Sequence, residues 1–323
     1  MRRFLSLPLF LGLAACAGTR SAPEGAAFAF VDDPAAGVLL LREDGAPVLA
    51  YRYGDQLAPN VPADRTRSSY VHPIHGLDGE VLTDDFPADH QHHRGLSLMW
   101  PRMRVGEQGL ELWHIRGLRS LFRGWVTRAT TPAAALLEVE NAWVMDGGPE
   151  AAREEVAYLV HRAAASGRAI DVRYRITAGS RPVALQGQVD KGYGGLNLRF
   201  APREETVITT EAGVAADADL TRFAWADLSA RFGGRAESAG IAIFVAPAHP
   251  GFPPGWTLRH YGDLNVAWPG LAEVVLAPGE EVVLRYRLWV HRGGVEAGEV
   301  VAAWEAFLAE LRAGDDGFAV SNR

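Results

Sequence analysis

Short runs in which apolar and polar residues alternate recur along most of this chain, and they constrain its fold more than any other feature. From residue 170 to 176, apolar side chains alternate with charged ones. Successive side chains of a strand point to opposite faces, so this run predicts a strand with one buried and one solvated face. Similar alternating or β-rich runs span residues 37–42, 134–144, 183–189, 196–200, 240–246 and 282–291, separated by Gly, Pro, Asp and Asn. We therefore predict a mainly β protein, a large antiparallel β-sandwich.

The clearest helix pattern lies near the C-terminus, in residues 295–311. Its apolar side chains recur at helical spacing, at Val300, Val301, Trp304, Phe307, Leu308 and Leu311. This stripe predicts a helix that packs on the sandwich. Helix patterns are otherwise scarce, which disfavours a doubly wound α/β fold. The nearest fold analogy is the large two-sheet sandwich of sugar mutarotases and polysaccharide lyases.

Composition excludes several classes of protein. The 323 residues are 48% hydrophobic and 22% charged, which fits a globular chain and not a disordered one. The formal net charge of −7 argues against a nucleic-acid binder. The single cysteine, Cys16, can form neither an internal disulfide nor a cysteine-based zinc site.

The first 16 residues, MRRFLSLPLFLGLAAC, have the layout of a secretory signal peptide. The apolar run is too short to span a membrane, which needs about 20 residues. The stretch Leu13-Ala14-Ala15-Cys16 resembles the lipobox of bacterial lipoproteins, which implies cleavage before Cys16 and a lipid on its thiol; Ala17 then implies the outer membrane. We expect a signal peptide in residues 1–15, a flexible tether in 16–27 and one β-sandwich domain in 28–323, held in the cell envelope on the periplasmic side.

Side chains suited to acid–base catalysis or metal binding are most concentrated in residues 70–100, where five of the ten histidines fall within 22 residues. Three interpretations stay open. On an extended segment His90 and His92 share a face, so with a carboxylate they could hold a divalent metal, the one candidate cofactor. Without metal, a histidine oriented by Asp85 could transfer protons, while Arg94 binds a carboxylate or an oxyanion. The third interpretation is that these side chains only cap turns.

The run HPIHGLDGEVLTDDFPADHQHHRG resembles the hallmark of the PmoA-like domain family of bacterial secreted proteins, often labelled "methane oxygenase PmoA". The resemblance extends from about residue 30 to 312. Members of that family often occur with carbohydrate-degradation genes, which implies a carbohydrate substrate. The family pattern has an aromatic residue where this chain has His75. The resemblance therefore favours, as catalytic residues, His72, Asp85, His90, His93 and Arg94.

Two later segments add candidate residues. Lys191 is the single lysine among 32 basic residues and lies in the glycine-rich run DKGYGGLNLR, which is similar to a second block of the same family. Lysine differs from arginine where a compact ammonium is needed, so Lys191 is a candidate catalytic residue. The Pro-, Gly- and aromatic-rich run 248–270 could wall a pocket. From these segments we expect substrate-binding residues at Tyr193, Trp256, Arg259 and Tyr261.

The sequence thus predicts a lipoprotein that acts on a carbohydrate or another small molecule, as a hydrolase, lyase or epimerase. His90 and His93 would serve as acid and base, and Lys191 would neutralise oxygen charge. Two alternatives stay open: a metal-dependent oxygenase or hydrolase that uses His90 and His92, and a non-catalytic glycan-binding lipoprotein. A glycosidase would need two carboxylates, which Asp84 or Asp85 and a distant Glu could supply. No GxSxG elbow, GxGxxG or GxxxxGK[ST] motif is present.

The lipobox makes a direct prediction for Cys16. Replacing it by Ser removes the thiol that would carry lipid, so Cys16→Ser is expected to lose incorporated palmitate and to leave the membrane fraction of expressing cells. Mass spectrometry of the mature N-terminus measures the same event. Palmitate labelling that persists in Cys16→Ser would contradict the prediction.

Overall fold

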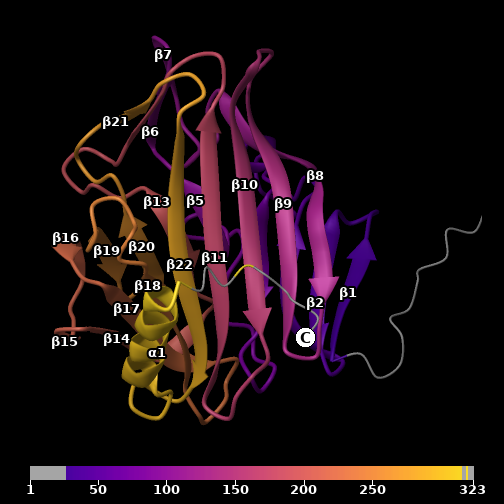
Figure 1. The fold of residues 1–323 in the computed structure, drawn as a ribbon, viewed down its shortest axis with the longest axis vertical. Helices are drawn as coiled ribbons and strands as arrows, with labels where there is room; N and C mark the ends of the chain where they lie inside the picture. Colours follow the sequence, from indigo (N-terminus) through magenta and orange to yellow (C-terminus); the bar gives the residue numbers. More distant parts are fainter. Residues whose placement is uncertain (1–26, 315–317, 319–323) are drawn as a thin grey trace, which may run out of the picture.

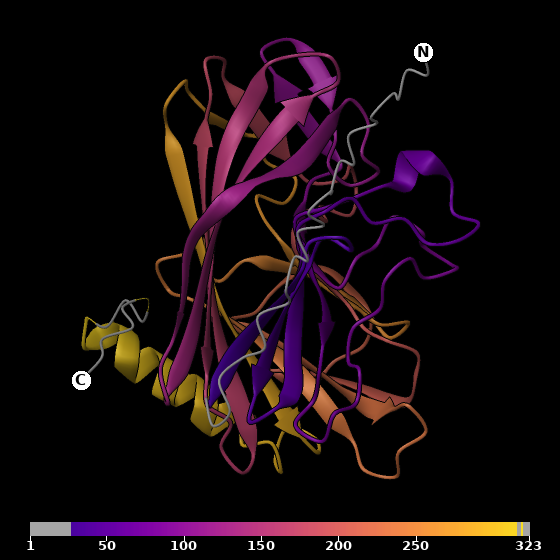
Figure 2. The same ribbon diagram turned by 90° about the vertical axis from the view of Figure 1, so that its right-hand side faces the viewer.

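The computed structural model describes residues 27–314 and Phe318. Two nine-stranded sheets pack face to face, and a four-stranded sheet lies at one end of the sandwich (Figures 1 and 2). Every ladder between named strands is antiparallel. The predicted mainly β, antiparallel sandwich is confirmed.

The first sheet has the order β1-β2-β3-β4-β5-β13-β20-β19-β16. Its strands are β1 (Phe28–Asp33), β2 (Val38–Glu43), β3 (Ala46–Arg52), β4 (Tyr70–Ile74), β5 (Leu96–Met99), β13 (Gly195–Arg199), β20 (Asp263–Ala267), β19 (Gly255–Arg259) and β16 (Ala218–Arg222). Its members come from both halves of the chain, so β5 and β13, about a hundred residues apart, are neighbours.

The second sheet has the order β15-β14-β17-β18-β22-β11-β10-β9-β8 and faces the viewer in Figure 1. Its strands are β15 (Gly213–Val214), β14 (Arg203–Thr210), β17 (Trp225–Phe232), β18 (Ala239–Val245), β22 (Glu281–Arg292), β11 (Gly167–Ala178), β10 (Glu150–His161), β9 (Ala134–Met145) and β8 (Leu118–Thr130). The small sheet, β21-β12-β6-β7, comprises β21 (Val274–Leu276), β12 (Val183–Gln186), β6 (Arg102–Val105) and β7 (Gln108–Leu110). One 3₁₀ turn, η1, spans Ala63–Arg65.

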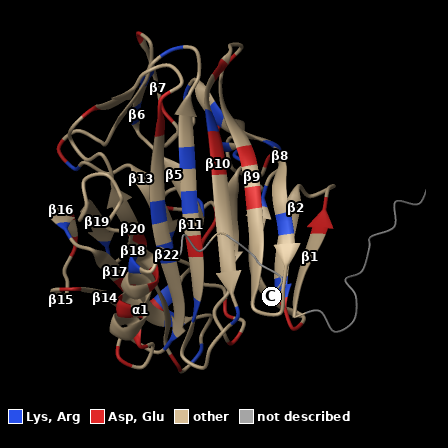
Figure 3. Cartoon of the chain, in the orientation of Figure 1, with Lys and Arg blue, Asp and Glu red and all other residues tan. Residues whose placement is uncertain are grey.

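All seven predicted runs form strands, with ends that shift by a few residues: β2, β9, β11, β12, β13, β18 and β22. The expectation that the charged side chains of run 169–176 are solvated is wrong for Asp171, which is 0% exposed. Arg287 on β22 donates two hydrogen bonds of 2.8 Å to its carboxylate, and Glu310 accepts a further one from Arg287 at 2.6 Å. Farther along this strand the charges do reach solvent, since the side chains of Arg173 and Arg175 are 26% and 38% exposed. Figure 3 marks the charged residues of β9, β10 and β11.

The C-terminal helix α1 (Val300–Arg312) lies on the outer face of the second sheet, as its apolar stripe predicts (Figure 2). Phe307 and Trp304 pack against Phe244 of β18. The helix begins five residues later than the sequence pattern indicates, because the preceding residue, Glu299, has a left-handed φ of 52° that a continuous helix cannot contain. No helix of residues 27–314 is long and apolar enough to cross a membrane.

A buried ion pair joins two strands of the second sheet. Nε2 of His291 on β22 lies 2.8 Å from Oδ1 of Asp227 on β17, and both side chains are 0% exposed. Ser229 donates a 2.6 Å hydrogen bond to the other oxygen of the carboxylate. Although burial opposes it, the Asp227 charge raises the pKa of His291 above its ordinary 6.5. As the pH rises, the unfolded chain therefore loses the His291 proton at a lower pH than the folded protein does.

Breaking this pair is expected to destabilise the fold. Asp227→Asn leaves His291 without its counter-charge and should lower the free energy of unfolding, measured in urea at pH 6, by about 3–5 kcal/mol. The deficit should shrink as the pH rises, because a raised His pKa contributes stability that is lost above it. Glu281→Gln, which removes the exposed partner of Arg175, is the control and should cost below about 1 kcal/mol. Equal losses in the two variants would contradict the assignment.

Candidate functional site

The central strands of the first sheet bury polar side chains on the face opposite the sandwich core. Ser97, Asn197, Asn265 and Thr257 pair in register across β5, β13, β20 and β19. Each is at most 4% exposed. The residues between them are apolar and point into the core, so strict alternation places one polar row on the outer face. A buried polar row needs partners, and the covering segments supply some of them: Ser97 donates to the carbonyl of Arg94, and Asn265 accepts from the amide of Gly194, whereas Oδ1 of Asn197 and Oγ1 of Thr257 have no hydrogen-bond partner among the described residues.

Asp263, at the start of β20, lies in the next row of this face, between Arg199 on β13 and Arg259 on β19. Its carboxylate is nearly inaccessible, and Asn197 donates a 2.9 Å hydrogen bond to Oδ1. Burial raises the pKa of Asp263 from 3.8 to about 6, against the opposing effects of Asn197 and Arg199. Within residues 27–314 no hydrogen bond reaches Oδ2, so that oxygen is available to a ligand.

The histidine-rich segment crosses this polar face as two successive turns. The amide of His90 donates to the carbonyl of Pro87 at 3.1 Å, and that of His93 to the carbonyl of His90 at 2.8 Å. The expectation of an extended segment is therefore wrong. The second turn brings His93 under His90, with ring centroids 4.9 Å apart, so His90, His92 and His93 lie together.

Four segments enclose a cavity of about 280 Å³ over the polar face. Aromatic rings form its walls: Trp113 lies 4.6 Å from Tyr193, and Tyr261 stacks on His90 at 5.1 Å and 11°. The residues around the cavity combine these rings with acid–base groups and two cations. They are His90, His92, His93, Trp113, His114, Lys191, Tyr193, Thr257, Arg259, Tyr261 and Asp263.

Two of the cavity histidines are neutral at physiological pH. Burial, then the nearby His114 and His90, lowers the pKa of His92 from 6.5 to about 3. Burial also lowers the pKa of His93, whose Nδ1 lies 3.4 Å from Oδ1 of Asp263 without making a hydrogen bond. A neutral imidazole can both accept and donate a proton, which suits acid–base chemistry beside a carboxylate.

An ion pair holds the outer wall in place. Nη2 of Arg199 donates to both oxygens of Asp89 at 2.7 and 2.8 Å, and the guanidinium lies 4.8 Å from the Tyr261 ring. Against the effect of burial, Arg199 and His90 lower the pKa of Asp89 to about 2. Asp89 thus stays ionised, with Oδ2 2.9 Å from Nδ1 of His90. It positions the stacked pair of His90 and Tyr261 and does not transfer protons near neutral pH.

Lys191 is the free cation of the cavity. It lies in a tight turn closed by hydrogen bonds from Gly192 to Gln188 at 2.7 Å and from Gln188 to Tyr193 at 2.9 Å. The turn needs Gly192, whose φ is 69° and whose Cα faces Leu220 too closely for a Cβ. Lys191 is exposed and makes no ion pair or hydrogen bond with any described residue.

Arg259, the other cation of the cavity, is already paired. It binds Asp219 at 2.5 Å and the carbonyl of Ala218 at 2.8 Å. Its charge is therefore compensated at the rim. Lys191 is left to meet a negative group of a ligand.

Of the predicted residues, the structure places His90, His92, His93, Lys191, Tyr193, Arg259 and Tyr261 around one cavity. Trp256 does not line it, because its side chain is 0% exposed and its indole donates to the carbonyl of Phe223. His72 lies apart as well, where Nδ1 is 3.0 Å from the Thr83 hydroxyl.

Arg94 and Asp85 support the histidine turns from behind. The Arg94 guanidinium is fully buried over the Phe86 ring and donates to the carbonyls of Gln91 and His93 at 2.8 and 2.6 Å. Asp85 lies 3.4 Å from it. Neither side chain lines the cavity, so their contacts position the turns that carry the histidines.

Sequence reasoning missed Asp263, Trp113, His114 and the positioning pair Asp89–Arg199. Asp263 does lie in the run 248–270, but its spacing there resembles no acid–base motif. A polar residue stands between apolar ones in LSL, LNL, LNV and WTL, but such alternation predicts one solvated face, so it gave no sign that this face is covered. His114, next to Trp113, is 21 residues after His93 and gives no local signal.

The proposed metal pair is not completed by a third ligand. The rings of His90 and His92 lie 5.7 Å apart at 75°. Among the residues that the structure describes, no group of three or more His, Cys, Asp or Glu side chains is arranged to hold a metal ion. The metal interpretation stays a prediction without further support from this geometry.

Comparisons with known proteins identify a family. The model of the family described as "Family of unknown function (DUF6807)" matches residues 39–305. No curated protein matches the chain. Among solved structures, galactose 1-epimerase from Lactobacillus acidophilus NCFM is similar at 9% identity and a TM-score of 0.36, over 82% of this chain and 94% of the other. A likeness at this TM-score does not inform function, and the resemblance to the PmoA-like family stays a prediction.

The burial of Asp263 predicts a pH-dependent cost in stability. A pKa raised from 3.8 to about 6 means that ionisation opposes folding, so stability is lost as the pH rises between those values. Asp263→Asn removes the charge and should raise the free energy of unfolding at pH 8 by about 3 kcal/mol. The gain should shrink toward pH 4. Urea unfolding across this range measures it, and a variant less stable than the wild type at pH 8 would contradict the buried charge.

Proposed function

This chain belongs to the DUF6807 family, and because that family has no known function, we propose one from the site: acid–base catalysis on a carbohydrate, as a lyase or an epimerase. The observation that carries the proposal is Asp263, the one carboxylate among the cavity residues that the structure describes, beside neutral histidines. Removal of a proton from carbon needs one such base. Hydrolysis of a glycosidic bond generally needs two carboxylates, one on each side of the bond.

The cavity walls support a sugar as ligand. A volume of about 280 Å³ suits a single small ring. The faces of Trp113, Tyr193 and Tyr261 offer apolar contact to the C–H faces of such a ring, while His92, Asp263 and other polar groups can bond to its hydroxyls. A sugar ring presents such an apolar face and a polar edge together.

The shifted pKa values support the division of roles. Burial raises the pKa of the Asp263 carboxyl to about 6 and lowers that of the His92 imidazole to about 3, and such opposed shifts mark acid–base pairs. At pH 7 Asp263 is mainly ionised and acts as the base that takes a proton from a carbon of the substrate. Its pKa lies close enough to neutrality for efficient transfer in both directions.

The electrons of the broken C–H bond then move onto an adjacent carbonyl or carboxylate oxygen, and Lys191 neutralises the charge that develops there. In an epimerisation, neutral His93 donates a proton from Nε2 to the opposite face of the same carbon while its Nδ1, 3.4 Å from Oδ1 of Asp263, accepts the proton that Asp263 removed, so that the carboxylate and a neutral imidazole are both regenerated. In an elimination, the histidine protonates the departing oxygen instead, and a C=C bond forms. In either case protons and electrons balance, and no oxidant or nucleophile is required.

We also propose that the enzyme works in the cell envelope. The signal-peptide layout and lipobox of residues 1–16 support this location, although Cys16 lies outside the described residues. The lipid would attach the chain to the outer membrane. The domain that carries the site would remain accessible to extracellular or periplasmic glycans. Catalysis by a metal at His90 and His92, and glycan binding without catalysis, are the outcomes that would replace this proposal.

The proposal predicts unequal effects of two Asp→Asn substitutions. Asp263→Asn removes the base and should lower kcat/KM by about 10²–10⁴-fold, measured on a panel of oligosaccharides with product analysis by mass spectrometry. Asp84→Asn, a half-buried carboxylate away from the cavity, should change kcat/KM less than about threefold.

The same panel separates the alternatives. Products that gain water, together with loss of activity in Asp84→Asn, would favour a two-carboxylate hydrolase. Activity abolished by a chelator and restored by a divalent metal would favour the metal enzyme. Binding without any product would favour a glycan-binding protein.

A further inference from the structure

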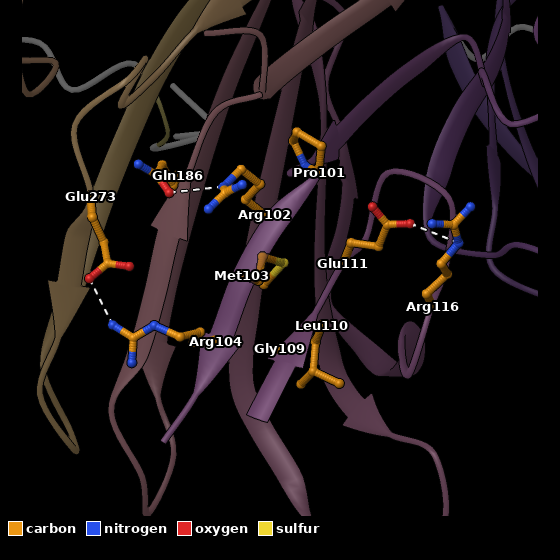
Figure 4. A pocket seen from close by; sticks show the side chains of 10 residues that line it. All are labelled: Pro101, Arg102, Met103, Arg104, Gly109, Leu110, Glu111, Arg116, Gln186 and Glu273. Carbon is orange, nitrogen blue, oxygen red and sulfur yellow. Dashed lines mark hydrogen bonds and ion pairs between the residues drawn. The ribbon is translucent and has the colours of Figure 1, made fainter. Parts of the chain in front are cut away.

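A second cavity, of about 440 Å³, opens on the face of the small sheet. Strands β6 and β7 and the end of β12 form its floor and sides. Figure 4 shows Arg102 and Arg104 on one side of it, Glu111 and Arg116 on the other, and Leu110 between them. Neither the family match nor the proposed function assigns a role to this cavity.

Two chain segments connect the second cavity directly to the first. Oε1 of Glu111, in the wall of the second cavity, lies 3.2 Å from Nδ1 of His114, which lines the first. Gln186 lines the second cavity, and the turn that follows it carries Lys191 into the first. Trp113 and Tyr193, one from each segment, touch between these positions. Lining residues of the two cavities are therefore in contact through Glu111 and His114, so the cavities are neighbours on the molecule.

The second cavity carries incompletely paired positive charge. The Arg102 side chain donates from Nε to a neutral partner, the amide oxygen of Gln186, at 3.0 Å (Figure 4). No carboxylate of the described residues forms an ion pair with Arg102, whereas Arg104 pairs with Glu273 at 2.7 Å. Arg116 is exposed and shares Glu111 with His114. Arg102 in the second cavity and Lys191 in the first are thus two cations that form no ion pair with a described residue.

The lining of the second cavity also indicates how a sugar would be recognised there. It contains no aromatic side chain among the described residues, so ring stacking of the kind that Trp113 and Tyr261 allow in the first cavity is absent. Guanidinium groups instead offer paired N–H donors that match carboxylate or sulfate oxygens. Recognition at this position depends on an anionic group of the ligand.

We propose that the second cavity is a binding subsite for the anionic sugar unit next to the one that reacts, so that the substrate is an acidic oligosaccharide. This inference rests on the proposed carbohydrate function of the first cavity. Arg102 and Arg116 bind the carboxylate or sulfate group of the neighbouring unit. Lys191 faces the corresponding group of the reacting unit, where it also stabilises the charge that develops during proton removal.

Calorimetric binding in an Asp263→Asn background, which prevents turnover, tests the subsite. The probes are galacturonic acid and its dimer and trimer, galactose oligomers of the same lengths, and a sulfated galactose dimer. We expect the galacturonate dimer to bind about tenfold more tightly than the monomer, as one added charge-assisted contact allows, and the gain to fall with salt. A gain with the sulfated dimer alone identifies sulfate as the anionic group. Equal gains with neutral oligomers, or no gain with either anionic series, would overturn the proposal.

Two matched variants locate the effect. Arg102→Gln should abolish the gain in affinity from monomer to dimer and leave monomer affinity unchanged. Arg123→Gln removes the same charge from an exposed pair with Glu150 and should leave both affinities unchanged. Identical behaviour of the two variants would remove Arg102 from the subsite. If the wild type turns over single sugars and its affinity does not depend on oligosaccharide length, the subsite alone is refuted. If affinity rises with oligosaccharide length but no product forms, only the catalytic proposal is refuted.

Discussion

Both faces of β13, β19 and β20 are buried, and the rest of the structure depends on how the outer face is satisfied. The inner face packs apolar side chains against the second sheet. The outer face carries Asn197, Asn265 and Thr257, whose polar groups would be costly without partners. Asn265 accepts from the amide of Gly194 and donates to the carbonyl of Leu196, so part of the row binds the backbone that leads to the lysine turn. The sheet thus organises the segments that enclose the site.

Asp263 is the buried carboxylate of this face, and its burial is not fully compensated. Asn197 reaches one oxygen only, and the nearby His93 offers no hydrogen bond to it. The resulting rise of its pKa to about 6 opposes folding at neutral pH. A structural carboxylate in this position could be replaced by a neutral residue with a gain in stability. An arrangement that keeps such a cost is characteristic of sites where the shifted group performs chemistry.

Local patterns were sufficient for the strands and for part of the site. Alternation in residues 170–176 requires a strand in any environment, because its period is that of the backbone itself. It could not show that Asp171 is covered, since Arg287, which donates two hydrogen bonds to its carboxylate, lies more than a hundred residues away. Likewise, the density of histidines identified His90 and His93, but local spacing could not separate them from Arg94, which is equally polar in sequence and fully buried in structure.

The sequence by itself therefore determined a β-sandwich with a C-terminal helix, and it indicated the histidine-rich segment and Lys191 as candidate site residues. Each of these features can be read from a short segment of sequence, because the periodicity and composition of that segment determine its local structure. Tertiary structure alone decided that Asp263, Trp113 and His114 join those histidines, and that a second cavity lies beside the first. The physical reason is that antiparallel pairing of β5, β13, β20 and β19 brings together residues from distant parts of the chain, and no local interaction encodes which strands become neighbours.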